Sequence, residues 1–430
     1  MQKFTLILLA VAAFCTPSRA ADTVANLPQA EILPIAFDER GVSGPGGERL
    51  KSELPDAQFV AIGEDHGFAE PPMLARALAV DMRRLKHPLF HAAEIGPSTA
   101  QWLRRQFGEK NTDLGLKAVG AAIKGKGLAM PFTSNVEDAR LAADFLGKDG
   151  KSRLWGIDQE FMGSPMILLE GLASTSSDRA IKQELKAISD ADQVALRKLA
   201  FNEAWLSTAE PENFDALETA FSKDAQAVRL LKQLSDSAKI YQLNNIGAYQ
   251  ASNERRSALM QGYFLQEYRR AGPSARVVLK MGAYHLGRGT TPVGIYDLGS
   301  LLPGLAAANG LKSLHIAYLP IGGNVRSISP SETAITAVKP YQDEGIGALL
   351  AVAGFPPEAV PASGYVLIPL ANIRQRLSGA QRRELPEIAR FVVTGFDYLV
   401  TTRDAKAATH FEAWVPDAGI PGNSGDTILN

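Results

Sequence analysis

The fold is indicated most clearly by residues 57–67, AQFVAIGEDHG, where an apolar run ends in a charged motif bounded by glycines. A run this apolar, with little polar alternation, is typical of a strand buried on both faces. Six similar runs follow, separated by amphipathic segments: 88–95, 153–159, 275–286, 313–321, 365–370 and 396–403. The sequence therefore predicts a three-layer α/β/α fold with a mostly parallel central sheet.

Residues 163–272 follow a different pattern, which is long, charged and helix-rich. Helical periodicity covers residues 178–188, 191–207, 213–234 and 240–270, and no convincing strand lies among them. We interpret this stretch as a helical insertion within one α/β domain (residues 21–430). We expect it to pack over one end of the sheet, either as a structural cap or as a lid.

The first 20 residues have the layout of a secretory signal peptide. Lys3 precedes an apolar run that ends at Phe14, and the small-residue exit Ser18-Arg19-Ala20 follows. Cleavage near Ala20 would remove Cys15, the only cysteine, so the mature chain would form no intramolecular disulfide. We expect a periplasmic or secreted protein.

The composition restricts the partners. The formal net charge is −1, and loss of Lys3 and Arg19 with the signal peptide would make it −3. A near-neutral chain of this kind disfavours nucleic acid as a partner. No second apolar stretch reaches the roughly 18 residues that a membrane-spanning helix needs. The expected partner is a small-molecule substrate, and the oligomeric state stays open.

Four of the predicted strands end in ionisable side chains beside glycine, in the segments 63–67, 94–96, 156–160 and 282–287. The carboxyl ends of parallel strands meet at one edge of the sheet, where such folds bind ligands. Isolated charges are costly to bury, so this coincidence favours a functional pocket over packing alone.

Glu64 and His66 are two residues apart, so both side chains should leave the strand on the same face. A carboxylate next to an imidazole raises its basicity and fixes its tautomer, which suits His66 to accept a proton from water. Asp65 should point away and cap the following helix. A structural role is an equally open reading of His66 and of His285. We expect only structural roles for the other histidines: His87, His91, His315 and His410.

Several sharper motifs are missing. The chain has no Gly-x-Ser-x-Gly elbow, which disfavours a common serine hydrolase, and no His-Glu-x-x-His helix. The segment 120–127, GAAIKGKG, begins like a phosphate-binding loop, but Gly127 stands where Ser or Thr should hold magnesium. We interpret it as a chance match.

Taken together, GEDHG (63–67), AAEIG (92–96) and GAYHLG (282–287) resemble the superfamily that joins erythromycin esterases with ChaN-like proteins. The resemblance extends from about residue 57 to residue 412 and includes the GID motif at 156–158. It implies a three-layer fold with its pocket at the strand ends. In the esterase branch it also implies metal-independent hydrolysis with a histidine base.

The resemblance implies a role for each site residue. His66 would activate water, Glu64 and Glu94 would orient the water and hold developing charge, and His285 would polarise or position the substrate carbonyl. Secondary substrate contacts would come from Glu70, Arg76, Asp158 and Arg256. For the two arginines, a solvated or salt-bridged helix residue is an equally open reading.

The chain also departs from the esterase pattern. One residue separates Glu64 from His66, where the esterases usually have two, and this shorter spacing is more similar to the ChaN branch, whose member of that name binds haem and iron. The GAYHLG segment also resembles metal-dependent peptidases of the TraB and TIKI group.

Three functional hypotheses follow. The first is an ester hydrolase without a cofactor. The second is a metal-dependent hydrolase or peptidase that uses Glu64, His66, Glu94 and His285 as ligands of a divalent metal. The third is a haem- or iron-binding protein with Tyr284 or His285 as axial ligand. A structural module without activity is a fourth reading.

Overall fold

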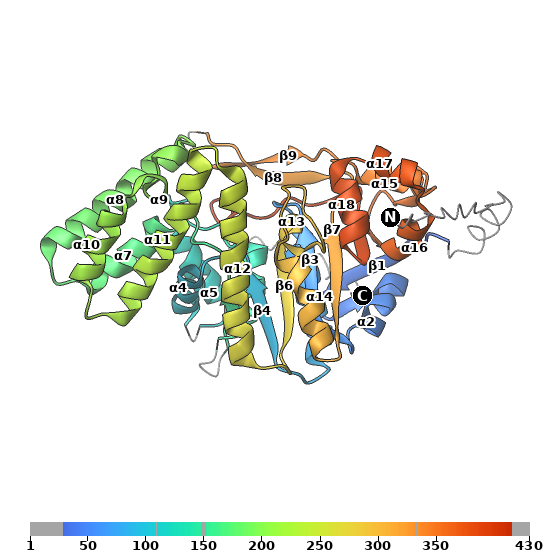
Figure 1. Ribbon diagram of the computed structural model, residues 1–430, viewed down its shortest axis with the longest axis horizontal. Coiled ribbons are helices and arrows are strands. Elements are labelled where there is room, and N and C mark those ends of the chain that lie inside the picture. The colour runs from blue at the N-terminus through green and yellow to red at the C-terminus, as the bar shows by residue number, and fades with distance from the viewer. Residues whose placement is uncertain (1–28, 109, 148–151, 332–333, 415–430) are drawn as a thin grey trace, which may run out of the picture.

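The computed structural model describes residues 29–108, 110–147, 152–331 and 334–414. At its centre lies a nine-stranded sheet with the order β2-β1-β10-β11-β7-β3-β6-β4-β5. Figure 1 shows β4, β6, β3 and β7 in the middle of the molecule. Every neighbouring pair from β11 to β5 is parallel, whereas β10, β1 and β2 are added antiparallel. The strands are β1 (Leu33–Asp38), β2 (Gly41–Ser43), β3 (Ala57–Glu64), β4 (Leu89–Ala93), β5 (Leu154–Gly156), β6 (Arg276–Gly282), β7 (Lys312–Tyr318), β10 (Tyr365–Pro369) and β11 (Tyr398–Thr401).

Helices cover both faces of this sheet, because β3 sends alternate apolar side chains to two separate cores. Val60 belongs to the core that includes Leu74 of α3. Phe59 belongs to the opposite core, where its ring lies 5.7 Å from that of Phe264 in α12. Every residue of β3 is buried, as its continuous apolar run predicted. The three-layer α/β/α prediction is confirmed.

The helices outside the predicted insertion are distributed along the whole chain. Figure 1 shows α12, α14 and α18 on one face of the sheet. The helices are α2 (Gly44–Glu53), α3 (Glu70–Arg83), α4 (Pro97–Phe107), α5 (Thr112–Ala122), α6 (Val136–Ala143), α13 (Ala283–Leu286), α14 (Leu298–Ala308), α15 (Ile346–Val352), α16 (Leu370–Arg376), α17 (Gly379–Glu384) and α18 (Glu387–Gly395), with the 3-10 turn η2 (Pro357–Ala359).

The segment between β5 and β6 is helical, as its periodicity predicted. Its elements are α7 (Pro165–Thr175), α8 (Arg179–Arg197), η1 (Phe201–Glu203), α9 (Trp205–Thr208), α10 (Pro211–Ala220), α11 (Ala225–Asn245) and α12 (Tyr249–Ala271). The helices α7 to α11 form a lobe beside the sheet, and α12 packs on the sheet face (Figure 1). Most of the insertion therefore lies beside the sheet and not over the carboxyl ends of its strands.

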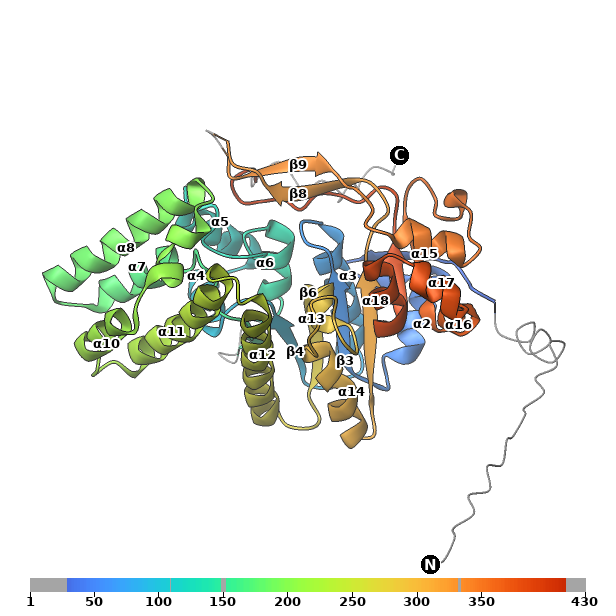
Figure 2. The same cartoon turned by 45° about the horizontal axis from the view of Figure 1, so that its top comes forward.

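A separate antiparallel ribbon, β8 (Asn324–Ile328) and β9 (Thr336–Pro340), lies across the carboxyl ends of the strands instead (Figure 2). The backbone N–H of Arg326 donates to the carbonyl of Gly67, just beyond β3, at 3.0 Å. The sequence did not predict this ribbon, nor β1 and β2. The ribbon leads directly into Tyr341, which lines the cavity described below.

The predicted signal peptide, residues 1–20, lies outside the described residues. Over the part of the chain that is described, no helix combines the length and the apolarity needed to cross a membrane.

Candidate active site

Three adjacent strands bring the four predicted catalytic residues around one cavity of about 300 Å³. Glu64 is the last residue of β3, Glu94 directly follows β4, and His285 lies in the short helix α13 directly after β6. The cavity is lined by Glu64, Asp65, His66, Glu94, Arg256, Gly282, Ala283, Tyr284, His285, Leu319, Tyr341, Glu344, Ile346 and Ile388. Residues that are far apart in the sequence thus share a single site at the carboxyl edge of the sheet.

Glu64 fixes the tautomer of His66. His66 Nδ1 lies 3.0 Å from Glu64 Oε1, and because a carboxylate only accepts, Nδ1 carries the proton. In the neutral ring, the lone pair is therefore on Nε2. His66 Nε2 is 3.9 Å from Glu94 Oε2, too far for a direct hydrogen bond. The Glu64 side chain is 2% exposed and that of His66 is 39% exposed, so a buried acid holds an accessible base.

Burial alone would lower the pKa of His66, but the charge of Glu94 and the hydrogen bond that His66 donates to Glu64 outweigh it and raise that pKa above its usual value. Asp65 does not cap the following helix as predicted. Its Oδ1 accepts the backbone N–H of His66 at 2.9 Å, and α3 begins only at Glu70. Asp65 lines the cavity instead, where burial raises its pKa.

Glu94 lies between one backbone donor and two basic side chains of the site. Its Oε2 accepts the backbone N–H of Gly282 at 2.7 Å, and its Oε1 accepts from Arg256 Nη2 at 2.9 Å. His285 Nε2 lies 3.2 Å from the same Oε1. Burial opposes ionisation, yet the charges of His285, His66 and Arg256 hold the pKa of Glu94 well below its usual range. Glu94 is therefore an anion with cations on two sides.

His285 is held between two carboxylates. Its Nδ1 lies 2.7 Å from Asp297 Oδ2, and its Nε2 faces Glu94. Burial and Arg256 lower the pKa of His285, but Glu94 and Asp297 outweigh them and raise it to about 9. His285 is therefore cationic at neutral pH, unlike an ordinary histidine.

Arg256 is the contribution of the insertion to the cavity. It lies on α12, where its Nε and Nη2 donate to the two oxygens of Asp158 at 2.9 and 2.5 Å. This two-point pairing fixes the plane of the guanidinium group, which also donates to Glu94. Asp158 does not line the cavity, so it acts through Arg256 rather than as the predicted substrate contact.

The other two predicted substrate contacts, Glu70 and Arg76, do not line this cavity. Glu70 is buried at the start of α3 and accepts the backbone N–H of Lys406 at 2.7 Å. Burial raises the pKa of Glu70 to about 7. Arg76 Nε donates to Asp144 Oδ2 at 2.9 Å. This arginine is therefore salt-bridged, which was the alternative interpretation of it.

Lys280 and Asp297, which the sequence did not predict as site residues, contact Glu64 and His285 directly. Lys280 Nζ lies 2.5 Å from Glu64 Oε1, and its side chain is only 5% exposed. A lysine inside the apolar run RVVLKMG (276–282) was a visible signal, because unpaired lysine is almost never buried. Asp297, the partner of His285, also caps α14 by accepting the N–H of Leu298, and such a cap carries no mark of a second role.

Gly282 keeps space open between the base and Glu94. A β-carbon at this position would lie 3.0 Å from His66 Nε2 and 3.7 Å from Glu94 Oε2. Any other residue would therefore crowd the place where a water bonded to both groups would sit.

The side chains of this site fit neither a divalent metal ion nor iron well. Both ring nitrogens of His285 and both oxygens of Glu94 already have partners. Lys280 and Arg256 supply positive charge to the acids where a metal ion would. Among the described residues, no group of three or more His, Cys, Asp or Glu side chains has the arrangement of a metal site.

His91 and His315 lie within strands and have backbone partners. His91 Nδ1 donates to the carbonyl of Val278 at 3.0 Å, and His315 Nδ1 donates to that of Leu286 at 2.7 Å. Burial lowers the pKa of each to about 4. These two histidines are neutral and structural, as predicted.

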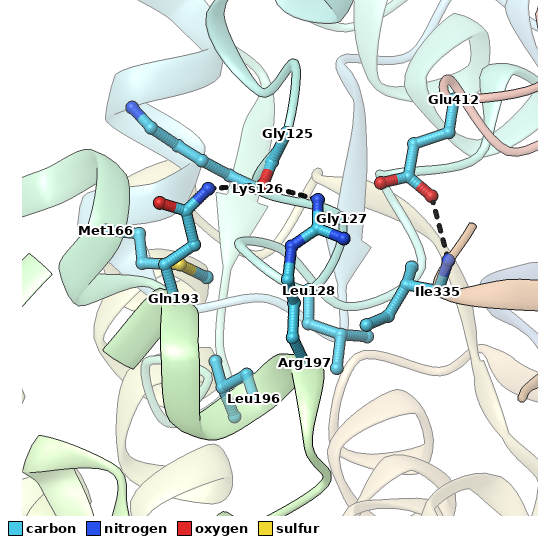
Figure 3. Close-up of a pocket in the computed structure, with 10 residues that line it drawn as sticks. All are labelled: Gly125, Lys126, Gly127, Leu128, Met166, Gln193, Leu196, Arg197, Ile335 and Glu412. Carbon is cyan, nitrogen blue, oxygen red and sulfur yellow. Dashed lines mark hydrogen bonds between the residues drawn. The ribbon is translucent and has the colours of Figure 1, made fainter. Parts of the chain in front are cut away.

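A smaller pocket surrounds the glycine-rich segment 125–127 (Figure 3). Gln193 Nε2 and Arg197 Nη2 both donate to the carbonyl of Gly125, at 2.6 and 3.4 Å. Gly120, where the loop-like motif begins, lies within helix α5 rather than after a strand. The phosphate-loop reading is therefore rejected, as the sequence predicted.

No family model matches the chain, and no curated protein matches it by sequence. Solved structures do match it. A mutant of the erythromycin esterase EreC in its open conformation has 16% identity and a TM-score of 0.53, over 84% of this chain and 94% of that chain.

A succinoglycan biosynthesis protein has 13% identity and a TM-score of 0.53, over 92% and 99% of the two chains. A Bacillus cereus protein has 12% identity and a TM-score of 0.51, over 91% and 98%. At such identities the likeness establishes the fold: this chain has the α/β fold of the erythromycin esterase EreC.

Proposed function

We propose that this protein is an exported hydrolase that cleaves an ester or a related acyl bond, using water activated by His66 and no metal ion. One observation carries the proposal: Glu64 holds the Nδ1 proton of His66, so that the Nε2 lone pair remains available within a cavity that Glu94 shares. This is the arrangement that a general base needs.

The first step would be proton transfer. A water that donates one hydrogen to His66 Nε2 and the other to Glu94 Oε2 keeps its oxygen lone pair for the substrate carbonyl. As the water oxygen bonds to the carbonyl carbon, His66 Nε2 takes the proton and becomes an imidazolium, which the Glu64 carboxylate stabilises.

The second step would be collapse of the tetrahedral intermediate. Its oxyanion is stabilised by the positive charges of His285 and Arg256, which already flank Glu94. The carbon–oxygen bond to the leaving group then breaks, and His66 returns its proton to the leaving alkoxide. The products are a carboxylic acid and an alcohol, and the enzyme regains its starting protonation.

Two further facts support the proposal. The erythromycin esterase EreC has the same fold, although its substrate is not carried over at 16% identity. Export rests on the signal-like pattern of residues 1–20.

The test is a panel of aryl and alkyl esters, lactones and peptides, assayed with and without EDTA. We expect hydrolysis that survives chelation and falls by roughly 10²- to 10⁴-fold in His66→Ala. His87→Ala, at an exposed histidine, is the control and should keep the native rate. Activity that EDTA abolishes and one metal restores would favour the metallohydrolase, and native turnover by His66→Ala would overturn the mechanism.

A further inference from the structure

Phe132 has a backbone conformation that bulky residues rarely adopt. It lies between α5 and α6, with φ at +48°. This left-handed region is costly for residues with a β-carbon, and such strain persists only where the surroundings enforce it. Strained residues cluster at functional sites, so the contacts of this side chain are informative.

The Phe132 ring lies against the proposed base. It stacks on the His66 imidazole with centroids 4.1 Å apart and an interplanar angle of 29°. The ammonium group of Lys280 lies over the same ring, 5.6 Å from its centroid. Phe132 therefore contacts both the catalytic imidazole and the lysine that binds the Glu64 carboxylate.

Lys280 ties this group to the rest of the protein. Its ammonium group lies 2.5 Å from Glu64 Oε1 and 2.7 Å from Asp138 Oδ1, and all three side chains are buried. Asp138 belongs to α6, which begins four residues after Phe132. The bridge from Asp138 through Lys280 thus fixes Glu64 relative to the segment that carries the aromatic ring.

One hydrogen bond is not enough to fix His66. The bond from Nδ1 to Glu64 leaves the ring free to swing about that contact, and the side chain is 39% exposed. A stacked aromatic ring removes this freedom, because it defines the plane in which the imidazole lies. The direction of the Nε2 lone pair is then set by two contacts instead of one.

We propose that Phe132 is a positioning residue for His66, and that Lys280 and Asp138 hold Phe132 and Glu64 in register so that Nε2 faces the reacting water. This inference rests on the proposed function. The strained backbone of Phe132 is what allows its ring to lie against the imidazole.

The chain offers a matched control. Phe145 contacts another histidine, His91, with centroids 5.4 Å apart, and the guanidinium group of Arg83 lies over its ring at 4.8 Å. His91 does not line the cavity, whereas His66, the partner of Phe132, does. The same substitution at Phe145 therefore disturbs a comparable aromatic cluster that has no role in the reaction.

The first measurement does not depend on activity. Stacking should shift the carbon-bound ring protons of His66 upfield in NMR spectra, and His66→Ala identifies those signals. Phe132→Leu should remove this ring-current shift, Phe132→Tyr should keep it, and Phe145→Leu should leave it unchanged. An unchanged His66 shift in Phe132→Leu would overturn the proposal.

The second measurement is turnover of an ester that the native protein hydrolyses. Phe132→Leu should lower kcat by roughly tenfold to hundredfold with KM within about threefold, because a misdirected base slows chemistry and not binding. Phe132→Tyr should restore most of the rate, and Phe145→Leu should match the native rate. Phe132→Gly relieves the strain, so it should melt above Phe132→Ala and yet remain as slow.

The two proposals fail in different ways. If no substrate shows His66-dependent hydrolysis, the proposed function fails, while the NMR result still decides whether Phe132 orients His66. If His66→Ala is inactive and Phe132→Leu is as fast as the native protein, the function stands and the positioning role is refuted.

Discussion

Two regions of one sheet give the same residue type opposite properties. At the carboxyl ends of β3 and β6, His66 and His285 meet carboxylates, and their pKa values are raised. Inside β4 and β7, His91 and His315 meet backbone carbonyls, and their pKa values fall to about 4. Burial favours the neutral form in both regions, so the nearby acids decide the difference. The histidines with raised pKa values therefore lie at the carboxyl edge of the sheet, and those with lowered pKa values lie inside it.

The largest expected effect separates the two regions by activity. His66→Ala should lower kcat/KM by roughly 10²- to 10⁴-fold with little change in stability, because the side chain is partly exposed. His315→Ala should do the reverse, since it removes a fully buried ring. We expect a stability loss of about 2 kcal/mol or more with a near-native rate per folded molecule. Denaturant unfolding and steady-state rates on both variants provide the check.

Gly282→Ala should give the next largest effect. The added methyl group would lie 3.0 Å from His66 Nε2, so the ring or the strand end must shift by a few tenths of an ångström. We expect kcat to fall by roughly tenfold, because small misplacements of a base are costly. Gly171→Ala is the control, since a β-carbon there meets nothing within 4 Å. Equal rates for both variants would mean that no reacting water lies beside Gly282.

The sequence predicted the sheet well and the site in part. All seven apolar runs are strands in the structure. A strand that is buried on both faces needs apolar side chains at nearly every position, so its sequence is easy to recognise. The polar motifs after them pointed to the cavity because parallel strands end at one edge. The fold-level resemblance to erythromycin esterases is also confirmed.

What the sequence did not predict depends on side-chain direction and loop conformation. Asp65 lines the cavity because α3 begins only at Glu70, several residues after the end of β3. No motif in the sequence predicts the length of this connection. Phe132 lies in a loop and has a left-handed backbone conformation. A phenylalanine in the sequence gives no indication of that conformation. The strands of the β8–β9 ribbon are partly exposed, so their sequences contain no continuous apolar run that would predict them.

The pH dependence of hydrolysis should report the carboxyl-end histidines. His66 acts as a base only when neutral, so the rate should rise with pH through a pKa above 6.5. His285 stabilises the oxyanion only when protonated, so the rate should fall as pH rises through about 9. The expected profile is a bell with its optimum between these limits. A flat profile from pH 6 to 10 would remove both histidines from the mechanism.

Asp297→Asn should sharpen this profile with the smallest change in the molecule. The amide has only one oxygen, so it can accept from the N–H of Leu298 or from His285 Nδ1 but not from both, and it loses the negative charge. His285 then keeps only Glu94 as an anionic partner, so its pKa should fall and the alkaline limb should move to lower pH, by roughly one unit. The acidic limb should stay in place, because Asp297 does not contact His66.

An NMR titration of the histidine ring protons measures the same shift without substrate, with His91 and His315 as internal references that stay neutral over the whole range. If the signals of His285 were unmoved in Asp297→Asn, the carboxylates would not be the cause of its raised pKa, and the contrast between the two regions of the sheet would need another explanation.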